Sequence, residues 1–225
     1  MIADRPGREA AFEPLLDQLA GIFEPDQVAW EPRPDGREQD WYERCETKRL
    51  AIARAAAQDL DGVRDHADLV LRAIVHDTDS SGNRQLVQVA LRALGPRAVL
   101  EALIGYVESG DAAERTGATM AMYWARPAVV YDLREMREHR AEIEAADRDL
   151  LEVRGRARLA CLRAFLATDD PAQRAELSLR FTLDPGDYPS EWAADLARAA
   201  EIARAGGDRY GRLLRTLPPE WAARR

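Results

Sequence analysis

The sequence is poor in cysteine and has no long hydrophobic run, and each shortage excludes a class of protein. Cys45 and Cys161 are the only cysteines in 225 residues, and they lack Cys-x-x-Cys spacing. This argues against a disulfide framework or a zinc cluster and favours two reduced, structural thiols. No apolar run approaches the roughly 18 to 20 residues that span a bilayer, and the N-terminus lacks the hydrophobic core of a secretory signal. We expect a cytoplasmic protein with no membrane role.

Positive charge is also in deficit. The chain has 32 basic and 40 acidic residues, a net charge of −8 and an isoelectric point near 5.1. General binding of nucleic acid requires a positive surface that displaces counterions from phosphates, so this balance argues against a nucleic-acid partner, although a local basic patch remains open. With 46% hydrophobic and 32% charged residues, the chain is long enough for one well-buried domain or one elongated repeat domain.

Signatures of catalysis are missing as well. There is no G-x-S-x-G motif, no histidine near either cysteine in sequence and no glycine-rich phosphate loop, and Gly206-Gly207 has the pattern of a helix terminator. The strongest metal candidate, His76-Asp77-Thr78-Asp79, resembles the His-Asp pair of the all-α phosphohydrolases called HD domains. Those enzymes need a further upstream histidine, and His66 lies too close to His76 for that arrangement. We expect a solvated, Asp-rich helix end, and we assign no catalytic, cofactor-binding or metal-binding residue.

Helical periodicity is what the sequence has in abundance, most clearly in residues 83–125. Apolar residues recur there at helical spacing up to Gly95-Pro96, which ends one helix and begins the next. The second helix is expected to end at Gly110. Asp111, with Glu114 three residues later, has the pattern of a capping box for a third helix. Helices joined by such short turns must pack antiparallel in layers.

The rest of the chain brings the expected total to about nine or ten helices in a single α-helical domain, because strand patterns are nearly absent. A helix is expected to resume near Trp41 and to continue to Leu60, followed by a turn at Asp61-Gly62 and by a helix that Asp65 caps. Within residues 1–225 we expect an N-terminal helix at 9–23, a Pro-rich loop at 24–40, helix pairs over 48–182 with a charged insertion at 128–150, and C-terminal helices at 190–217.

Helices of similar character recur at 85–94, 111–124 and 154–165, each with small apolar residues in the middle and each followed by a short turn and a partner helix. Together with the segment RGRARLACLRAFLATDDP at 154–171, this rhythm resembles the HEAT or armadillo repeat family over residues 48–182. The resemblance implies an α-solenoid, in which helix pairs stack and form a concave binding surface. The repeat starts are unevenly spaced, so the resemblance requires the insertion at 128–150. An irregular helical bundle is the alternative.

Aromatic residues form the only cluster that suggests a binding surface. Tyrosine and tryptophan rings at predicted helix ends or in loops are typical of interaction hot spots, and core packing is the alternative, which we favour for Trp124 on its apolar stripe. We expect the segment 24–42 to fold back over one end of the stack and to contribute to partner recognition. The candidate partner-binding residues are Trp30, Trp41, Tyr42, Tyr123 and Tyr131.

These observations favour a non-catalytic protein–protein interaction module or scaffold, with another protein as its partner and no cofactor. The alternative is an enzyme on the same scaffold, such as the HEAT-like alkylpurine DNA glycosylases, which have a similar length and use aromatic and acidic residues in a concave groove. No motif in this sequence matches their functional residues, and the acidic charge balance argues against a duplex in such a groove. The partner and the oligomeric state do not follow from the sequence.

Overall fold

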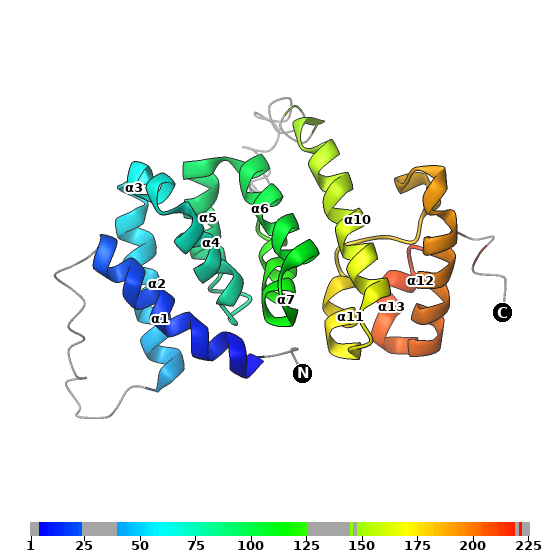
Figure 1. The fold of residues 1–225 in the computed structure, drawn as a ribbon, viewed down its shortest axis with the longest axis horizontal. Coiled ribbons are helices and arrows are strands. Elements are labelled where there is room, and N and C mark those ends of the chain that lie inside the picture. The colour runs from blue at the N-terminus through cyan, green and yellow to red at the C-terminus, as the bar shows by residue number, and fades with distance from the viewer. Residues whose placement is uncertain (1–4, 24–39, 126–144, 146–147, 219–220, 222–225) are drawn as a thin grey trace, which may run out of the picture.

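The computed structural model describes residues 5–23, 40–125, 145, 148–218 and 221, and every regular element in these ranges is a helix. Within these described ranges, ten α-helices have six residues or more, which confirms the all-α class and agrees with the expected number of helices. Figure 1 shows them spread along one axis, from α1–α3 at one end to α12 and α13 at the other. The elements are α1 (Arg5–Phe23), α2 (Trp41–Ala56), α3 (Leu60–Asp65), α4 (Ala67–His76), α5 (Arg84–Leu94), α6 (Pro96–Ser109), α7 (Ala112–Ala121), α10 (Leu151–Ala167), α11 (Pro171–Leu177), α12 (Ala193–Gly206), the single-turn α13 (Gly211–Leu214) and the 3-10 helices η2 (Pro185–Asp187), η3 (Ser190–Trp192) and η4 (Gly207–Tyr210).

Helices α5, α6 and α7 form where the sequence predicts them, because local signals fix their ends. Pro96 is the first residue of α6, and Gly95 before it has a φ of 83°, a conformation that glycine adopts without a Cβ clash. The capping box of α7 is complete: the Asp111 carboxylate accepts the Glu114 N–H at 2.8 Å, and the Glu114 carboxylate accepts the Asp111 N–H at 3.0 Å.

The expected turn at Asp61-Gly62 is wrong, because both residues lie inside α3. Asp59 is the reason: its side chain accepts the Gly62 N–H at 2.8 Å and so starts the helix earlier. A Cβ atom on Gly62 would collide with that carboxylate. The expected cap at Asp65 is also wrong, since Asp65 ends α3 and the residue before α4 is His66, whose side chain makes no capping hydrogen bond.

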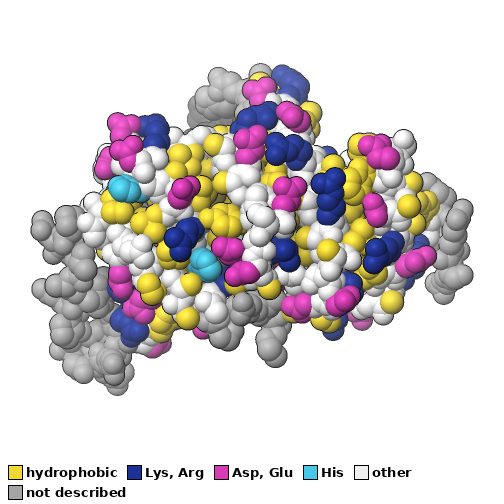
Figure 2. Space-filling model, in the orientation of Figure 1, with side chains coloured by type: hydrophobic (Ala, Val, Ile, Leu, Met, Phe, Trp, Pro, Cys, Tyr) yellow, Lys and Arg dark blue, Asp and Glu magenta, His cyan; other side chains and the backbone are white. Residues whose placement is uncertain are grey.

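The helices lie in two layers. In the first layer α2, α5, α6 and α10 follow one another, each packing on the next, and α12 packs on α10. In the second layer α1, α4, α7 and α11 do the same. Among the helices that the structure describes, four hairpins join the layers, namely α1 with α2, α4 with α5, α6 with α7, and α10 with α11. On the face shown in Figure 2, acidic and basic side chains are interspersed over the length of the molecule.

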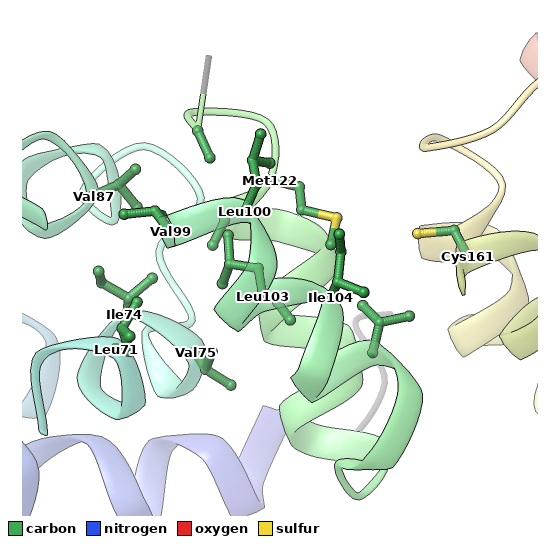
Figure 3. Packing of buried hydrophobic residues seen from close by; sticks show 14 of the residues in the cluster. Leu71, Ile74, Val75, Val87, Val99, Leu100, Leu103, Ile104, Met122 and Cys161 are labelled. Carbon is green, nitrogen blue, oxygen red and sulfur yellow. The ribbon is translucent and has the colours of Figure 1, made fainter. Parts of the chain in front are cut away.

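One hydrophobic core runs through these layers, from Phe12 of α1 to Leu213 of α13. Figure 3 shows part of it, where side chains of α4, such as Ile74, lie beside those of α6, and where the side chains of Met122, just after α7, and Cys161 of α10 point toward each other. Each layer buries one apolar face against the other, which is how amphipathic helices form a core.

Several expectations fall outside the described residues. They are the loop at 24–40 apart from Asp40, nearly all of the charged insertion at 128–150, and the candidate residues Trp30 and Tyr131. No helix in the described ranges combines the length and the apolar character that crossing a bilayer requires.

Candidate functional site

The loop between α4 and α5 is built around a buried arginine. Arg49 of α2 places its Nη1 atom 3.0 Å from each carboxylate oxygen of Asp77, and its Nη2 atom 2.8 Å from Oδ2 of Asp79. Inside the loop, Asp77 Oδ1 accepts the Asp79 N–H at 3.0 Å, and Asp79 Oδ1 accepts the Ser81 N–H at 2.9 Å. One guanidinium therefore bridges two carboxylates, and the same carboxylates accept backbone N–H groups of the loop.

A second buried arginine ties the N-terminal helix to the same loop. Arg8 of α1 donates from Nη2 to the backbone oxygen of Asp77, and its Nη1 lies 3.1 Å from the sulfur of Met120 in α7. Both arginine side chains are almost fully buried, and burying a charge is tolerated only when it is paired and hydrogen-bonded. The network therefore fixes α1, α2 and α7 relative to the loop.

The expectation of a solvated helix end is wrong for Asp77, which is 0% exposed. The missed signal is the spacing Asp-x-Asp-x-Ser-Gly from Asp77 to Gly82, which matches the first half of calcium-binding loops; the closing glutamate of such loops is replaced here by Gln88. The guanidinium of Arg49 lies against the carboxylates that would hold the metal, and a Cβ atom on Gly82 would overlap it. The loop thus contains a cation supplied by the chain itself.

Burial sets the ionisation of this network. It raises the pKa of Asp77 to about 6, although Arg49 acts in the opposite direction. Burial also opposes ionisation of Asp79, but the N–H groups of Gly82 and Ser81, together with Arg49, outweigh it and lower the pKa. Neighbouring His76 has a lowered pKa because it is partly desolvated.

Two of the predicted aromatic residues are brought to this loop. Tyr42 is 46% exposed and donates its hydroxyl to Asp79 Oδ2 at 3.0 Å. Trp124 donates its indole N–H to the backbone oxygen of Ser80 at 2.8 Å, and Tyr123, which is 47% exposed, packs edge-on against the Trp124 ring at 4.7 Å. Tyr42 and Tyr123 are therefore surface residues around one loop, whereas the rings of Trp41 and Trp124 pack partly against the core.

The two thiols are inert by position. Cys45 and Cys161 are both free and buried, and burial raises the pKa of each to about 12. Since the thiolate is the reactive form, neither side chain is available as a nucleophile at neutral pH. In the described ranges no three His, Cys, Asp or Glu side chains gather where they could hold a metal ion.

A hollow in the surface of the described residues lies where the C-terminal ends of α6 and α10 meet the start of α7. Its volume is about 680 Å³. Ala160, Ala164 and Ala167 of α10 leave this space because their side chains are short, while charged side chains of both signs stand around it. The remaining lining residues are Val107, Glu108, Arg115, Arg163, Thr168 and Asp169.

A smaller hollow of about 220 Å³ lies between α10 and α12 and shares Arg163 and Ala167 with the first. Here the guanidinium carbon of Arg163 lies 4.6 Å from the centre of the Trp192 ring, a cation–π contact. Arg198 of α12 lines the same hollow. In the described part of the chain, neither Arg163 nor Arg198 forms an ion pair. We call the two hollows together the α10 groove.

Other arginines of α10 are paired with carboxylates. Arg156 lies 3.3 Å from Glu101 of α6, and Arg158 lies 3.0 Å from Asp187 of η2. Arg163 therefore differs from them in having an aromatic ring as its neighbour, and it is the exposed arginine that both hollows share.

The two hairpins beside the groove repeat one capping arrangement. Arg115 of α7 donates from Nε to the Val107 oxygen at 3.0 Å, and Arg174 of α11 donates from Nε to the Phe165 oxygen at 3.1 Å. In both hairpins an arginine thus satisfies a carbonyl near the end of the preceding helix. Each arginine stands four residues after the aspartate that caps its own helix, and these aspartates are Asp111 and Asp170.

No family model matches the sequence, and no curated protein or solved structure matches it either. The function must therefore be argued from the surface that the helices form.

Proposed function

We propose that the protein is a non-catalytic protein–protein interaction module built on a HEAT-like stack of helix hairpins. The α10 groove is the observation that carries the proposal. It is a surface hollow with an alanine floor, and at its α12 side an exposed arginine lies on a tryptophan ring. Tryptophan and arginine are the residues most enriched at interaction hot spots, and a row of short side chains leaves room for side chains of a partner.

The HEAT-like part of the proposal is supported by the stacking of the hairpins. The α6–α7 hairpin packs on the α10–α11 hairpin in both layers, and the capping by Arg115 and Arg174 recurs at the same place in each. Side chains of α11 and of the segment that follows it also bond carbonyl oxygens of α7: Gln173 of α11 donates to Ala112 at 3.3 Å, and Arg180, three residues after the end of α11, donates to Thr119 at 2.7 Å. Such contacts between neighbouring units are typical of helical repeat proteins.

One feature departs from a regular repeat. The first two hairpins, α1–α2 and α4–α5, run from the second layer to the first, whereas α6–α7 and α10–α11 run from the first to the second. Gly95 therefore joins two neighbours of the same layer. The stack that we propose thus consists of two halves, whose hairpins cross between the two layers in opposite directions.

A cytoplasmic location is part of the proposal, and two free, buried thiols fit a reducing compartment. The enzyme alternative lacks comparable support. The thiols have raised pKa values, and the carboxylates of Asp77 and Asp79 are engaged by Arg49 away from the groove.

Affinity capture from source cells with three bait proteins tests the proposed function. The baits are the wild type, Arg163→Glu in the groove and the control Arg156→Glu, which changes a paired arginine of the same helix. We expect a specific partner to be recovered with the wild type and the control but lost with Arg163→Glu, while thermal melting shows that all three are folded. Equal recovery with all three baits would contradict a role for the groove.

A further inference from the structure

We propose that the α10 groove binds an acidic segment of the partner, with one carboxylate seated between Arg163 and Arg198 beside Trp192. This inference rests on the proposed function and adds the chemistry of the partner. Three observations support it. Arg163 contacts the Trp192 ring and forms no ion pair in the described ranges, the smaller hollow has more basic than acidic side chains, and the floor of the larger hollow is apolar.

The side chain of Arg163 is preorganised to bind a carboxylate. Its guanidinium carbon lies 4.6 Å from the centre of the Trp192 ring, and a cation–π contact with the ring does not use the N–H donors that a carboxylate accepts. Stacking also restricts the side chain before a ligand arrives, which reduces the entropy lost on binding. In the described ranges no carboxylate of the chain bonds to Arg163, whereas Arg156 and Arg158 on the same helix have such partners.

The smaller hollow has an excess of positive charge. Arg163 and Arg198 line it together with one acidic residue, Asp195. Asp195 is in the first turn of α12, where the N-terminal amides of the helix favour a negative charge. It forms no ion pair with either arginine in the described part of the chain, so an additional carboxylate would find two guanidinium groups.

The larger hollow explains why the ligand should be a peptide segment rather than a small anion. It continues from Arg163 over Ala160 and Ala164, which can accept the apolar neighbours of an acidic residue. Of the two acidic side chains that line this hollow, Asp169 is paired with Arg174 at 3.1 Å. The positive end of the groove is therefore at α12, and we expect the acidic residue of the partner to bind at that end.

Two fluorescein-labelled probe peptides test the inference. One is a hexapeptide of alternating glutamate and alanine, and the other has lysine in place of glutamate. With the full-length protein at low ionic strength, we expect fluorescence anisotropy to show binding of the acidic peptide only, weakened by added salt. Arg163→Gln and Arg198→Gln should each reduce the affinity about fivefold, as expected for loss of a charge-assisted hydrogen bond, and the control Arg156→Gln should leave it unchanged.

A second measurement locates the peptide. The acidic peptide should change the tryptophan emission of the wild type, and the change should be absent in Trp192→Phe. Equal affinity for the two peptides, no binding of the acidic peptide, or affinity that is insensitive to Arg163→Gln would overturn the inference. If the peptides fail while partner capture still depends on Arg163, the acidic class is wrong and the interaction module stands. If capture is also insensitive, the proposed function fails with it.

Discussion

Gly117 of α7 lies against the backbone of Val75 in α4. A Cβ atom on Gly117 would be 2.6 Å from the carbonyl carbon of Val75 and closer still to its oxygen. The obstacle is backbone inside a helix, so it cannot move aside as a flexible side chain can. The close approach of the second and third hairpins in the second layer therefore requires a residue without a side chain at this position.

Gly117→Ala should lower the free energy of unfolding by about 3 kcal/mol or more, because the added methyl group forces α4 and α7 apart. Urea unfolding followed by circular dichroism measures the change. Gly21→Ala in α1 is the matched control, since a Cβ atom there meets nothing within 4 Å. The control should be neutral or slightly stabilising. A small effect of Gly117→Ala would mean that the two helices are not in contact as described.

Arg49→Met should be among the most destabilising single changes in the protein. It leaves Asp77 buried without its bidentate partner and removes the 2.8 Å contact to Asp79, and breaking a buried ion pair in this way costs about 3 to 5 kcal/mol. Arg54→Met, an exposed arginine of the same helix, should change stability by less than about 0.5 kcal/mol. Combined with Asp77→Asn, the Arg49 variant should cost less than the sum of the single changes, which a double-mutant cycle would detect.

Acidification should affect the wild type and Asp77→Asn differently. The pKa of Asp77 is raised to about 6 in the folded protein, so the folded state binds the proton more tightly than the unfolded state. The stabilisation from that proton is fully present below pH 4 and is lost as pH rises through about 6. The unfolding free energy of the wild type relative to Asp77→Asn should therefore fall by about 3 kcal/mol between pH 3 and 8. A difference that does not vary with pH would show that Asp77 titrates normally.

Both thiols should resist alkylation in the folded protein. Cys45 and Cys161 are buried and have pKa values raised to about 12, so almost no thiolate is present at pH 8 and reagents have no access to it. We expect iodoacetamide to label neither residue within the time in which it labels both in denaturing guanidinium chloride. Mass spectrometry of the two peptides gives the extent. Rapid labelling of either cysteine under native conditions would contradict its burial.

The sequence could predict α5, α6 and α7 because their ends depend on neighbours along the chain. Pro96 and the Asp111–Glu114 pair act within a few residues of themselves, so their effect is visible without a tertiary structure. The error at α3 also has a local cause, which was misassigned rather than hidden. The capping residue is Asp59, but Gly62 has the appearance of a turn residue when its contact with Asp59 is not known.

The Arg49 network and the α10 groove could not be predicted in this way. Arg49 and Asp77 belong to different helices, and an arginine in an amphipathic helix gives no sign that its side chain will be buried. The groove depends on which residues from α6, α10 and α12 come together and on the small volume of alanines such as Ala164. Helical periodicity indicates that an alanine is on a buried face, but not that the space in front of it stays open.

Gly95 separates the hairpins that run from the second layer to the first from those that run from the first to the second. This division should limit how far local unfolding extends through the molecule. The network of Arg49, Asp77 and Asp79 lies on the N-terminal side of Gly95. Two bonds cross Gly95, because Arg8 contacts Met120 and the loop between α4 and α5 accepts the indole N–H of Trp124, whereas the α10 groove lies wholly on the C-terminal side. The two halves meet through α5 with α6 and α4 with α7, as well as through weaker contacts of α1 with α7 and of α4 with α6. A substitution that loosens the network should therefore expose amide protons of α1, α2 and α4 to hydrogen exchange while α6, α10 and α12 keep their protection.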